Sequence, residues 1–280
     1  MTPEAEIPEV AQPLRVSVVI VTHNRAELLR RGLEALGDAH QVLVVDNGST
    51  DGTAGLDEQF PAVRFIRLPK NFGLTKAMNI GARSADGTYI LFLHDDVRVS
   101  GEAVTRLADF LEARQDVGAV CPLLLNEAGT AVRQVRALPT PADPDPGFVP
   151  ASGGDEMLAQ CASGAAIMMR AHFLKALRHV DERYGNYGSD AEISAQVRSA
   201  NRKLVILRGV TAVHEWAASP VKKSALEGDR AQGTAAFLGK HHGFVTGMMY
   251  RLKVGLAAVF TFRFGVVMGA FSGVKIDGTS

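Results

Sequence analysis

Several features that would fix a class of protein at once are scarce in this sequence. Only two of the 280 residues are cysteines, Cys121 and Cys161, and their spacing fits neither a metal-ligand motif nor a disulfide framework. This favours a reducing compartment. Positive and negative charges also cancel, with thirty Lys or Arg against thirty Asp or Glu, so no overall field favours a nucleic acid as partner.

The first residues lack the apolar core of a secretion signal. Residues 1–13 are polar and contain proline, so we expect an N-terminal tail there. No internal repeat is apparent either. With 46% hydrophobic and 21% charged residues, the chain can still bury a substantial core.

Two adjacent carboxylates follow an apolar segment near the middle of the chain. Residues 89–93 are typical of a buried strand, and His94, Asp95 and Asp96 come directly after it. An isolated pair of aspartates is more often a solvated turn. Buried at the carboxyl end of a strand, however, such a pair needs a cation or hydrogen-bond donors, and ligands of open α/β sheets bind at that end.

Strand-like and helix-like segments alternate around this stretch. This alternation predicts a largely parallel sheet with helices on both faces. Asn24 is placed to cap the first helix, and the proline-rich residues 138–150 predict a loop without helix. The expected strands cover residues 15–22, 41–45, 63–68, 88–93, 162–170 and 203–207, and the expected helices lie near residues 25–36, 76–85, 102–114, 190–200 and 224–242.

Seven segments carry motifs that occur together in one known family. They are Val18–Arg25, Val44–Thr53, Asn71–Gly73, Asn79–Gly81, Gly87–Asp96, Asp181–Ile193 and His214. Taken together, they resemble a family 2 inverting glycosyltransferase of the GT-A fold, in its rhamnosyltransferase-like branch. The resemblance implies an α/β nucleotide-sugar-binding domain over residues 14–216, a mostly parallel Rossmann-like sheet, and a helical C-terminal segment over residues 217–280.

For the nucleotide, the resemblance implies that Asp46 contacts the base, with Thr22 and Asn24 beside it. Asp95 would lie near the ribose or a metal-bound water. Each assignment has a plainer alternative. Asp46 also fits an Asx-turn before Gly48. The bases Arg25 and Lys76 fit phosphate oxygens but also a solvated surface, and Asn71 and Asn79 fit structural cross-links.

For the metal, the resemblance implies Mg²⁺ or Mn²⁺ held by Asp96, with His214 as a further ligand. Hard divalent cations prefer oxygen ligands and bridge carboxylates to phosphates. His94 stands where the family has the first Asp of its Asp-x-Asp pattern, which leaves the ligand set open. A single histidine after a strand is more often structural, which is the plainer alternative for His214.

The resemblance makes Asp190 the catalytic base, at the start of a helix whose N-terminus favours its ionised form. Ser189 replaces the Glu that precedes this Asp in relatives, and a helix cap is the plainer alternative for Asp190. Glu192 lies two residues further on and should face away, so we expect it to support the site residues from behind or to be structural. Tyr184, Tyr187 and the loop 138–150 are candidates for the acceptor side.

The last segment is apolar and basic. Between Lys240 and Lys275 there are five bases and no acid, and residues 254–271 are apolar except for Thr261 and Arg263. This favours a helix lying on an anionic membrane surface. Packing against the catalytic domain or a partner subunit, and a short membrane span, remain alternatives, and the row of glycines suits close helix contact.

The sequence thus predicts a metal-dependent glycosyltransferase in the cytoplasm, at the inner face of the membrane if the last segment docks there. Its partners would be a nucleoside-diphosphate sugar and a hydroxyl acceptor, with a lipid-linked acceptor and a homodimer left open. Two alternatives remain. An inactive nucleotide-sugar-binding scaffold would explain His94 and Ser189. A sugar nucleotidyltransferase would need a glycine-rich phosphate loop after the first strand, and residues 22–25 do not form one.

Overall fold

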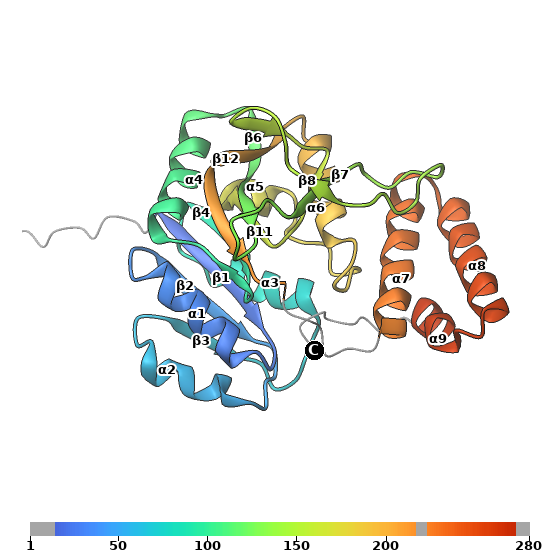
Figure 1. The fold of residues 1–280 in the computed structure, drawn as a ribbon, viewed down its shortest axis with the longest axis horizontal. Coiled ribbons are helices and arrows are strands. Elements are labelled where there is room, and N and C mark those ends of the chain that lie inside the picture. The colour runs from blue at the N-terminus through green and yellow to red at the C-terminus, as the bar shows by residue number, and fades with distance from the viewer. Residues whose placement is uncertain (1–14, 217–222, 273–280) are drawn as a thin grey trace, which may run out of the picture.

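A mixed sheet of nine strands organises the described part of the chain (Figure 1). The structure is a computed structural model that describes residues 15–216 and 223–272, so the expected tail over residues 1–13 lies outside the described residues. The sheet strands are β1 (Val16–Thr22), β2 (Gln41–Asp46), β3 (Arg64–Arg67), β4 (Tyr89–His94), β5 (Val97–Arg98), β6 (Val117–Leu125), β9 (Glu156–Leu158), β11 (Ala166–Arg170) and β12 (Lys203–His214).

The strands are arranged in the order β3-β2-β1-β4-β11-β6-β12-β5, with β9 paired to β12. The pairs among β3, β2, β1 and β4 are parallel, as predicted. Strand β11 lies antiparallel between β4 and β6. Apolar patterning does not show the direction of a strand, which explains why the sequence did not predict this reversal. The α/β fold is confirmed, in a mixed sheet where four of the eight strand pairs are parallel and four are antiparallel.

Helices cover both faces of the sheet, and the side chains of β1 alternate between these two faces. Val18 and Ile20 pack with helices α1 (Ala26–Leu36) and α4 (Gly101–Ala113). Val19 and Val21 face the opposite core. That core also contains side chains of α3 (Leu74–Arg83), α5 (Ala171–Ala176) and α6 (Ser189–Ser199). Cys121 and Cys161 are buried and unpaired, as their spacing predicted.

Short elements complete the domain at the edges of the sheet. Residues 138–150 contain no helix, as predicted, and end in a strand of a small antiparallel sheet. These remaining elements are a 3₁₀ turn (Gly52–Gly55), α2 (Leu56–Gln59), β7 (Arg133–Arg136), β8 (Val149–Pro150) and β10 (Cys161–Ala162).

Three helices follow the sheet and lie together at one end of the molecule (Figure 1). They are α7 (Lys223–His241), α8 (Phe244–Phe260) and α9 (Phe264–Ser272). The apolar stretch over residues 254–271 was expected as one helix, and this is wrong. The helical hydrogen bonding stops at Thr261, and Phe262 has a φ of 55°, which turns the chain between α8 and α9.

Helices α8 and α9 both pack against α7. Among the described residues, no helix combines the length and the apolar character needed to cross a bilayer. The boundary proposed at residue 216 precedes residues 217–222, which lie outside the described part, and it stays a prediction.

Candidate active site

Asp95 and Asp96 lie in the turn between β4 and β5, and both are buried. Donors from β1 and the residues after it meet them. Thr22 Oγ1 donates to Asp95 Oδ2 at 2.9 Å, and Arg25 Nη1 lies 3.5 Å from one oxygen of each aspartate. The burial of two carboxylates is thus compensated by donors and a cation, which excludes the solvated turn. Arg25 is also not a solvated surface charge.

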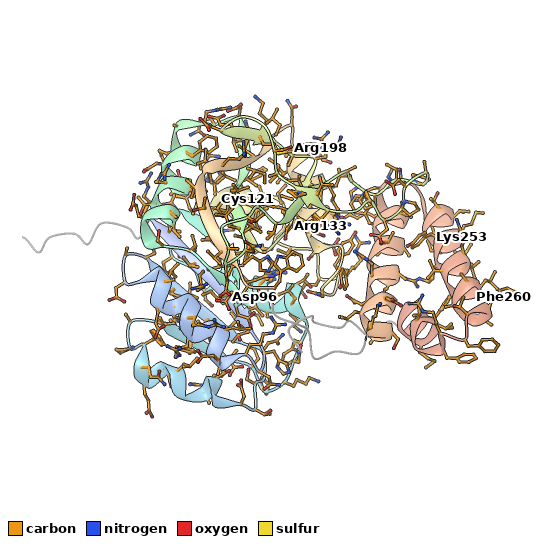
Figure 2. The ribbon with its side chains drawn as sticks, in the orientation of Figure 1. Asp96, Cys121, Arg133, Arg198, Lys253 and Phe260 are labelled. Atoms are coloured by element: carbon orange, nitrogen blue, oxygen red, sulfur yellow. The ribbon has the colours of Figure 1, made fainter. Side chains whose placement is uncertain are left out.

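Two histidines face Asp96, which Figure 2 labels near the carboxyl ends of the central strands. Pairing between β12 and β5 sets His214 opposite Val97 and brings its Nε2 to 3.3 Å from Asp96 Oδ1. His94 Nδ1 lies 4.0 Å from the same oxygen. One ligand atom from each of the three residues falls within 4.8 Å of the others. The cluster has the size and composition of a metal site.

Unsatisfied atoms mark the same cluster. The contact between Asp96 Oδ1 and His214 Nε2 lacks hydrogen-bond geometry, so Asp96 Oδ1 is buried without a hydrogen-bond partner in the described residues. The other ring nitrogen of His214, Nδ1, is likewise buried without a partner there. Burial alone would raise the pKa of Asp96. The contact with His214 and the charges of His94, His214 and Arg25 outweigh it and lower this pKa to about 2. Asp96 is therefore ionised at neutral pH, as a metal ligand must be.

Asp190 lies in the first turn of α6. Gly188 is the N-cap residue, with a φ of 93° that favours glycine, so Asp190 is not the cap itself. Its Oδ1 accepts a hydrogen bond from the Ala191 N–H at 2.8 Å. The side chain is 16% exposed and points to Arg136, whose Nη2 lies 3.1 Å and 3.3 Å from its two oxygens.

One cavity of about 330 Å³ joins the cluster of His94, Asp96 and His214 to Asp190. Arg136 is nearly buried, lies over the ring of Phe148 at 4.5 Å and also faces Asp145 at 3.7 Å. Asp145 in turn meets Arg230 of α7 at 3.3 Å. The polar and charged residues that line the cavity are Arg25, His94, Asp95, Asp96, Arg136, Ser163, Asn186, Tyr187, Ser189, Asp190, His214 and Arg230.

Several of these lining residues were missed by sequence reasoning. Arg136 belongs to a segment with no motif, and Arg230 belongs to the segment expected to form a separate appendage. Phe148 also lines the cavity, and it lies in the loop 138–150 that was a candidate for the acceptor side. Trp216 stacks on His214 with ring centroids 4.7 Å apart. The only signal for Trp216 in the sequence is its position two residues after His214.

Asp46 and Asn24 do not line this cavity. Asp46 is paired in register with Thr22 and accepts a hydrogen bond from the Ser49 N–H at 2.8 Å, which is the Asx-type turn left open above. Asn24 does not cap α1, and that prediction is wrong. Its Oδ1 accepts from the Thr50 N–H instead, while Asp51 accepts from the first N–H of the helix at Ala26.

Lys76 and the two asparagines also lie outside the cavity. Lys76 is exposed, with its Nζ 4.8 Å from the centre of the Phe72 ring. Asn71 accepts from the side chain of Asn47, and Asn79 exchanges hydrogen bonds with the backbone of Val180. Both asparagines are cross-links in the structure.

Glu192 joins α6 to α7. Its side chain is fully buried and accepts hydrogen bonds from Tyr184 Oη at 2.9 Å, Lys240 Nζ at 2.5 Å and His241 Nε2 at 2.8 Å. Burial would raise the pKa of Glu192, but these partners lower it below its ordinary value of 4.5. Tyr184 is therefore a buried structural residue, whereas Tyr187 lines the cavity.

The profile of glycosyl transferase family 2 matches residues 17–175, more than half of the chain. The chain belongs to this family and is a glycosyltransferase.

Two bacterial relatives illustrate the similarity. An O-antigen biosynthesis protein of Myxococcus xanthus, RfbC, is 27% identical over 80% of this chain and 19% of its own length. The N-acetylglucosaminyl-diphospho-decaprenol L-rhamnosyltransferase of Mycobacterium tuberculosis is 24% identical over 72% of this chain and 76% of its own. The chain thus covers only about a fifth of the first relative.

Solved structures share the fold at low sequence identity. S. aureus TarS residues 1–349 in complex with UDP-GlcNAc superposes with a TM-score of 0.60 at 16% identity, covering 92% of this chain and 73% of that one. The mannosyltransferase PcManGT of Pyrobaculum calidifontis in complex with GDP-Man and Mn²⁺ gives 0.56 at 18% identity, covering 97% and 77%. These GT-A neighbours support the fold predicted from the sequence.

Proposed function

We propose that this enzyme is a metal-dependent inverting glycosyltransferase that moves a sugar from a nucleoside diphosphate to a hydroxyl acceptor. One observation carries the proposal. The carboxylate of Asp190 and the cluster of His94, Asp96 and His214 line the same cavity. A base for the acceptor and a site for the leaving diphosphate are the two parts that such a transfer needs.

The residues of the cluster fit a divalent cation, because Asp96 Oδ1, which faces both histidines, is buried without a hydrogen-bond partner in the described part of the chain. His94, Asp96 and His214 would hold it. A bound cation would stabilise negative charge on the leaving diphosphate. Two imidazoles beside one carboxylate favour Mn²⁺ over Mg²⁺, which prefers an all-oxygen shell.

Asp190 acts as the base in this proposal. The acceptor oxygen bonds to the anomeric carbon from the face opposite the diphosphate, while the bond between that carbon and the diphosphate oxygen breaks. The acceptor proton passes to Asp190, and the electron pair of the broken bond leaves with the diphosphate. Arg136 contacts both oxygens of Asp190 and fixes the orientation of the carboxylate.

The nucleotide would bind where β2, β1 and β4 end side by side. Thr22, Asp46 and Asp95 lie at these neighbouring strand ends, which supports contacts to base and ribose. Asn24 holds the adjoining loop, and Arg25 lines the cavity 3.5 Å from an oxygen of each aspartate. Lys76 is exposed beside Phe72, so its phosphate contact would require the side chain to move.

The names of relatives support a lipid-linked acceptor. One relative acts on a decaprenol diphosphate sugar, and another is an undecaprenyl-phosphate transferase from Proteus mirabilis. We propose the same chemical class of acceptor for this chain, in the synthesis of cell-surface polysaccharide or glycolipid. The enzyme would then work in the cytoplasm at the inner face of the membrane, held there by its C-terminal helices.

The test is turnover of nucleoside-diphosphate sugars by Asp190→Asn. This variant keeps the shape of the side chain and removes only the proton acceptor. Donor binding should stay within a few fold while turnover falls by ~10² or more. Unchanged turnover would assign the base elsewhere. If the unaltered enzyme bound the donor with Mn²⁺ but transferred no sugar to any hydroxyl acceptor, lipid-linked or soluble, it would be the inactive scaffold.

A further inference from the structure

The outer surface of α8 and α9 is strongly apolar. Of the fifteen large hydrophobic side chains exposed in the described residues, twelve lie between residues 244 and 271. We call these twelve the α8–α9 face. Figure 2 shows one of them, Phe260, on the outer side of the helices, away from the sheet. Its members are Phe244, Val245, Met248, Met249, Leu252, Leu256, Val259, Phe260, Phe262, Phe264, Met268 and Phe271.

The helices contact each other through small residues on their inner side, so the large side chains of the α8–α9 face remain exposed. A Cβ added to Gly247 would lie 2.4 Å from the carbonyl oxygen of Ala235 on α7, and one added to Gly228 would lie 2.7 Å from the Cα of Gly269 on α9. The helices therefore meet backbone to backbone. Their large side chains point outward, where a folded monomer gains nothing from them.

A cavity of about 320 Å³ lies between α7 and α8, at the edge of this face. Its floor is formed by small and apolar residues, and three cations line it. Arg183 and Lys240 are both paired with Asp181. Arg251 has no ion pair within the described residues. The cavity is lined by Arg183, Ala235, Ala236, Gly239, Lys240, Phe244, Gly247, Met248 and Arg251.

The charges near the α8–α9 face indicate which partner it would contact. No residue from 240 to 272 is acidic, and the cations Arg251 and Lys253 of α8 are unpaired in the described structure. A second copy seated on the same face would bring like charges together. An anionic bilayer complements both the apolar side chains and the unpaired cations.

We propose that this cavity binds the phosphate headgroup of an anionic membrane lipid while the α8–α9 face enters the bilayer interface. Arg251 binds the phosphate with N–H donors of its planar guanidinium, and Arg183 also lines the cavity. The acyl chains continue over Phe244 and Met248, which line the cavity and belong to the face. The proposal rests on the membrane location proposed above.

Vesicle flotation of the full-length protein tests it, without sugar donor or metal. One set of vesicles is pure phosphatidylcholine, and the other is an equal mixture with phosphatidylglycerol. We expect the protein to float with the mixture and Leu256→Glu to abolish flotation. Arg251→Gln is compared with Lys253→Gln, which removes the same charge from the same helix outside the cavity.

A charge that acts only through the surface potential contributes about fivefold in affinity, which we expect for Lys253→Gln. Arg251→Gln should weaken binding to the mixed vesicles by at least about tenfold more, because it also removes the hydrogen bonds to phosphate. Equal losses in the two variants would overturn the headgroup site. Absence of flotation together with a dimer in gel filtration that Leu256→Glu dissociates would assign the face to subunit contact.

Binding of a nucleoside diphosphate with Mn²⁺ to the same preparations separates this proposal from the proposed enzyme function. Both Gln variants should bind the nucleotide like the unaltered protein, since Arg251 and Lys253 line no part of the active-site cavity. Loss of lipid binding with intact nucleotide binding affects only the lipid site. Loss of nucleotide binding in the unaltered protein would affect only the catalytic proposal.

Discussion

Arg136 of β7 contacts both carboxylate oxygens of Asp190 in α6 through one nitrogen, Nη2, at 3.1 Å and 3.3 Å. The guanidinium is held in place by the ring of Phe148 beneath it and by Asp145 beside it. The proposed base is therefore oriented by a side chain that is itself fixed before any substrate binds.

Replacing Arg136 tests this orienting role. We expect Arg136→Gln to lower kcat by about 10–100-fold, because a misplaced base loses its alignment with the acceptor hydroxyl. The Kd for nucleoside diphosphate with Mn²⁺ should change little. Arg133→Gln, an exposed position on the same strand, is the matched control. An equal loss in nucleotide affinity would instead show that Arg136 binds the donor.

The cluster of His94, Asp96 and His214 leads to a prediction about metal-dependent nucleotide binding. Asp96→Ala should remove Mn²⁺-dependent binding of a nucleoside diphosphate, since Asp96 supplies the central oxygen of the cluster. Asp95→Ala should weaken it less, because Asp95 already accepts from Thr22. Calorimetry with each variant measures both, and unchanged metal-dependent affinity in Asp96→Ala would refute the assignment.

His94 sets the second part of that prediction. His94→Asp replaces an imidazole by an oxygen ligand, so we expect its nucleotide-bound form to be stabilised by Mg²⁺ relative to Mn²⁺ more than the unaltered enzyme is. Thermal shifts with Mg²⁺, Mn²⁺ and Zn²⁺ in turn report the change. No change in preference would place His94 outside the ligand set.

Removing a partner of Glu192 should cost stability. Lys240→Met leaves a fully buried carboxylate without its strongest cation, and we expect a loss of about 3 kcal/mol in the free energy of unfolding. Lys253→Met on the exposed side of α8 should change it by no more than about 0.5 kcal/mol. Denaturant unfolding of the two variants gives the comparison. Similar values would mean that α7 contributes little to holding α6.

The same residue predicts a dependence on pH. Because partners lower the pKa of Glu192 in the folded state, its ionised form stabilises the fold above its ordinary pKa of 4.5. This contribution is lost as pH falls through the lower folded pKa. The difference in unfolding free energy between the unaltered protein and Glu192→Gln should therefore be constant near neutral pH and shift below about pH 4.5 in favour of the variant.

Much of the catalytic core could be predicted because its signals are local. A buried strand ending in Asp95 and Asp96 and a helix opening at Asp190 are visible in a few residues each. Arg136, Arg230 and the antiparallel β11 depend on how distant segments meet, and no local pattern encodes that. Asn24 shows the opposite error, since Asp51, brought near only by folding, caps the helix that Asn24 precedes.

The buried ion pairs of Glu192 also affect the order in which the chain can mature on the ribosome. Residues up to 216 emerge before α7, so the catalytic core is synthesised while Lys240 and His241 are still to come. Until then Glu192 must stay hydrated or protonated, because burying it unpaired would be unfavourable. The first turn of α6, which holds both Glu192 and Asp190, therefore becomes native only after α7 has been synthesised.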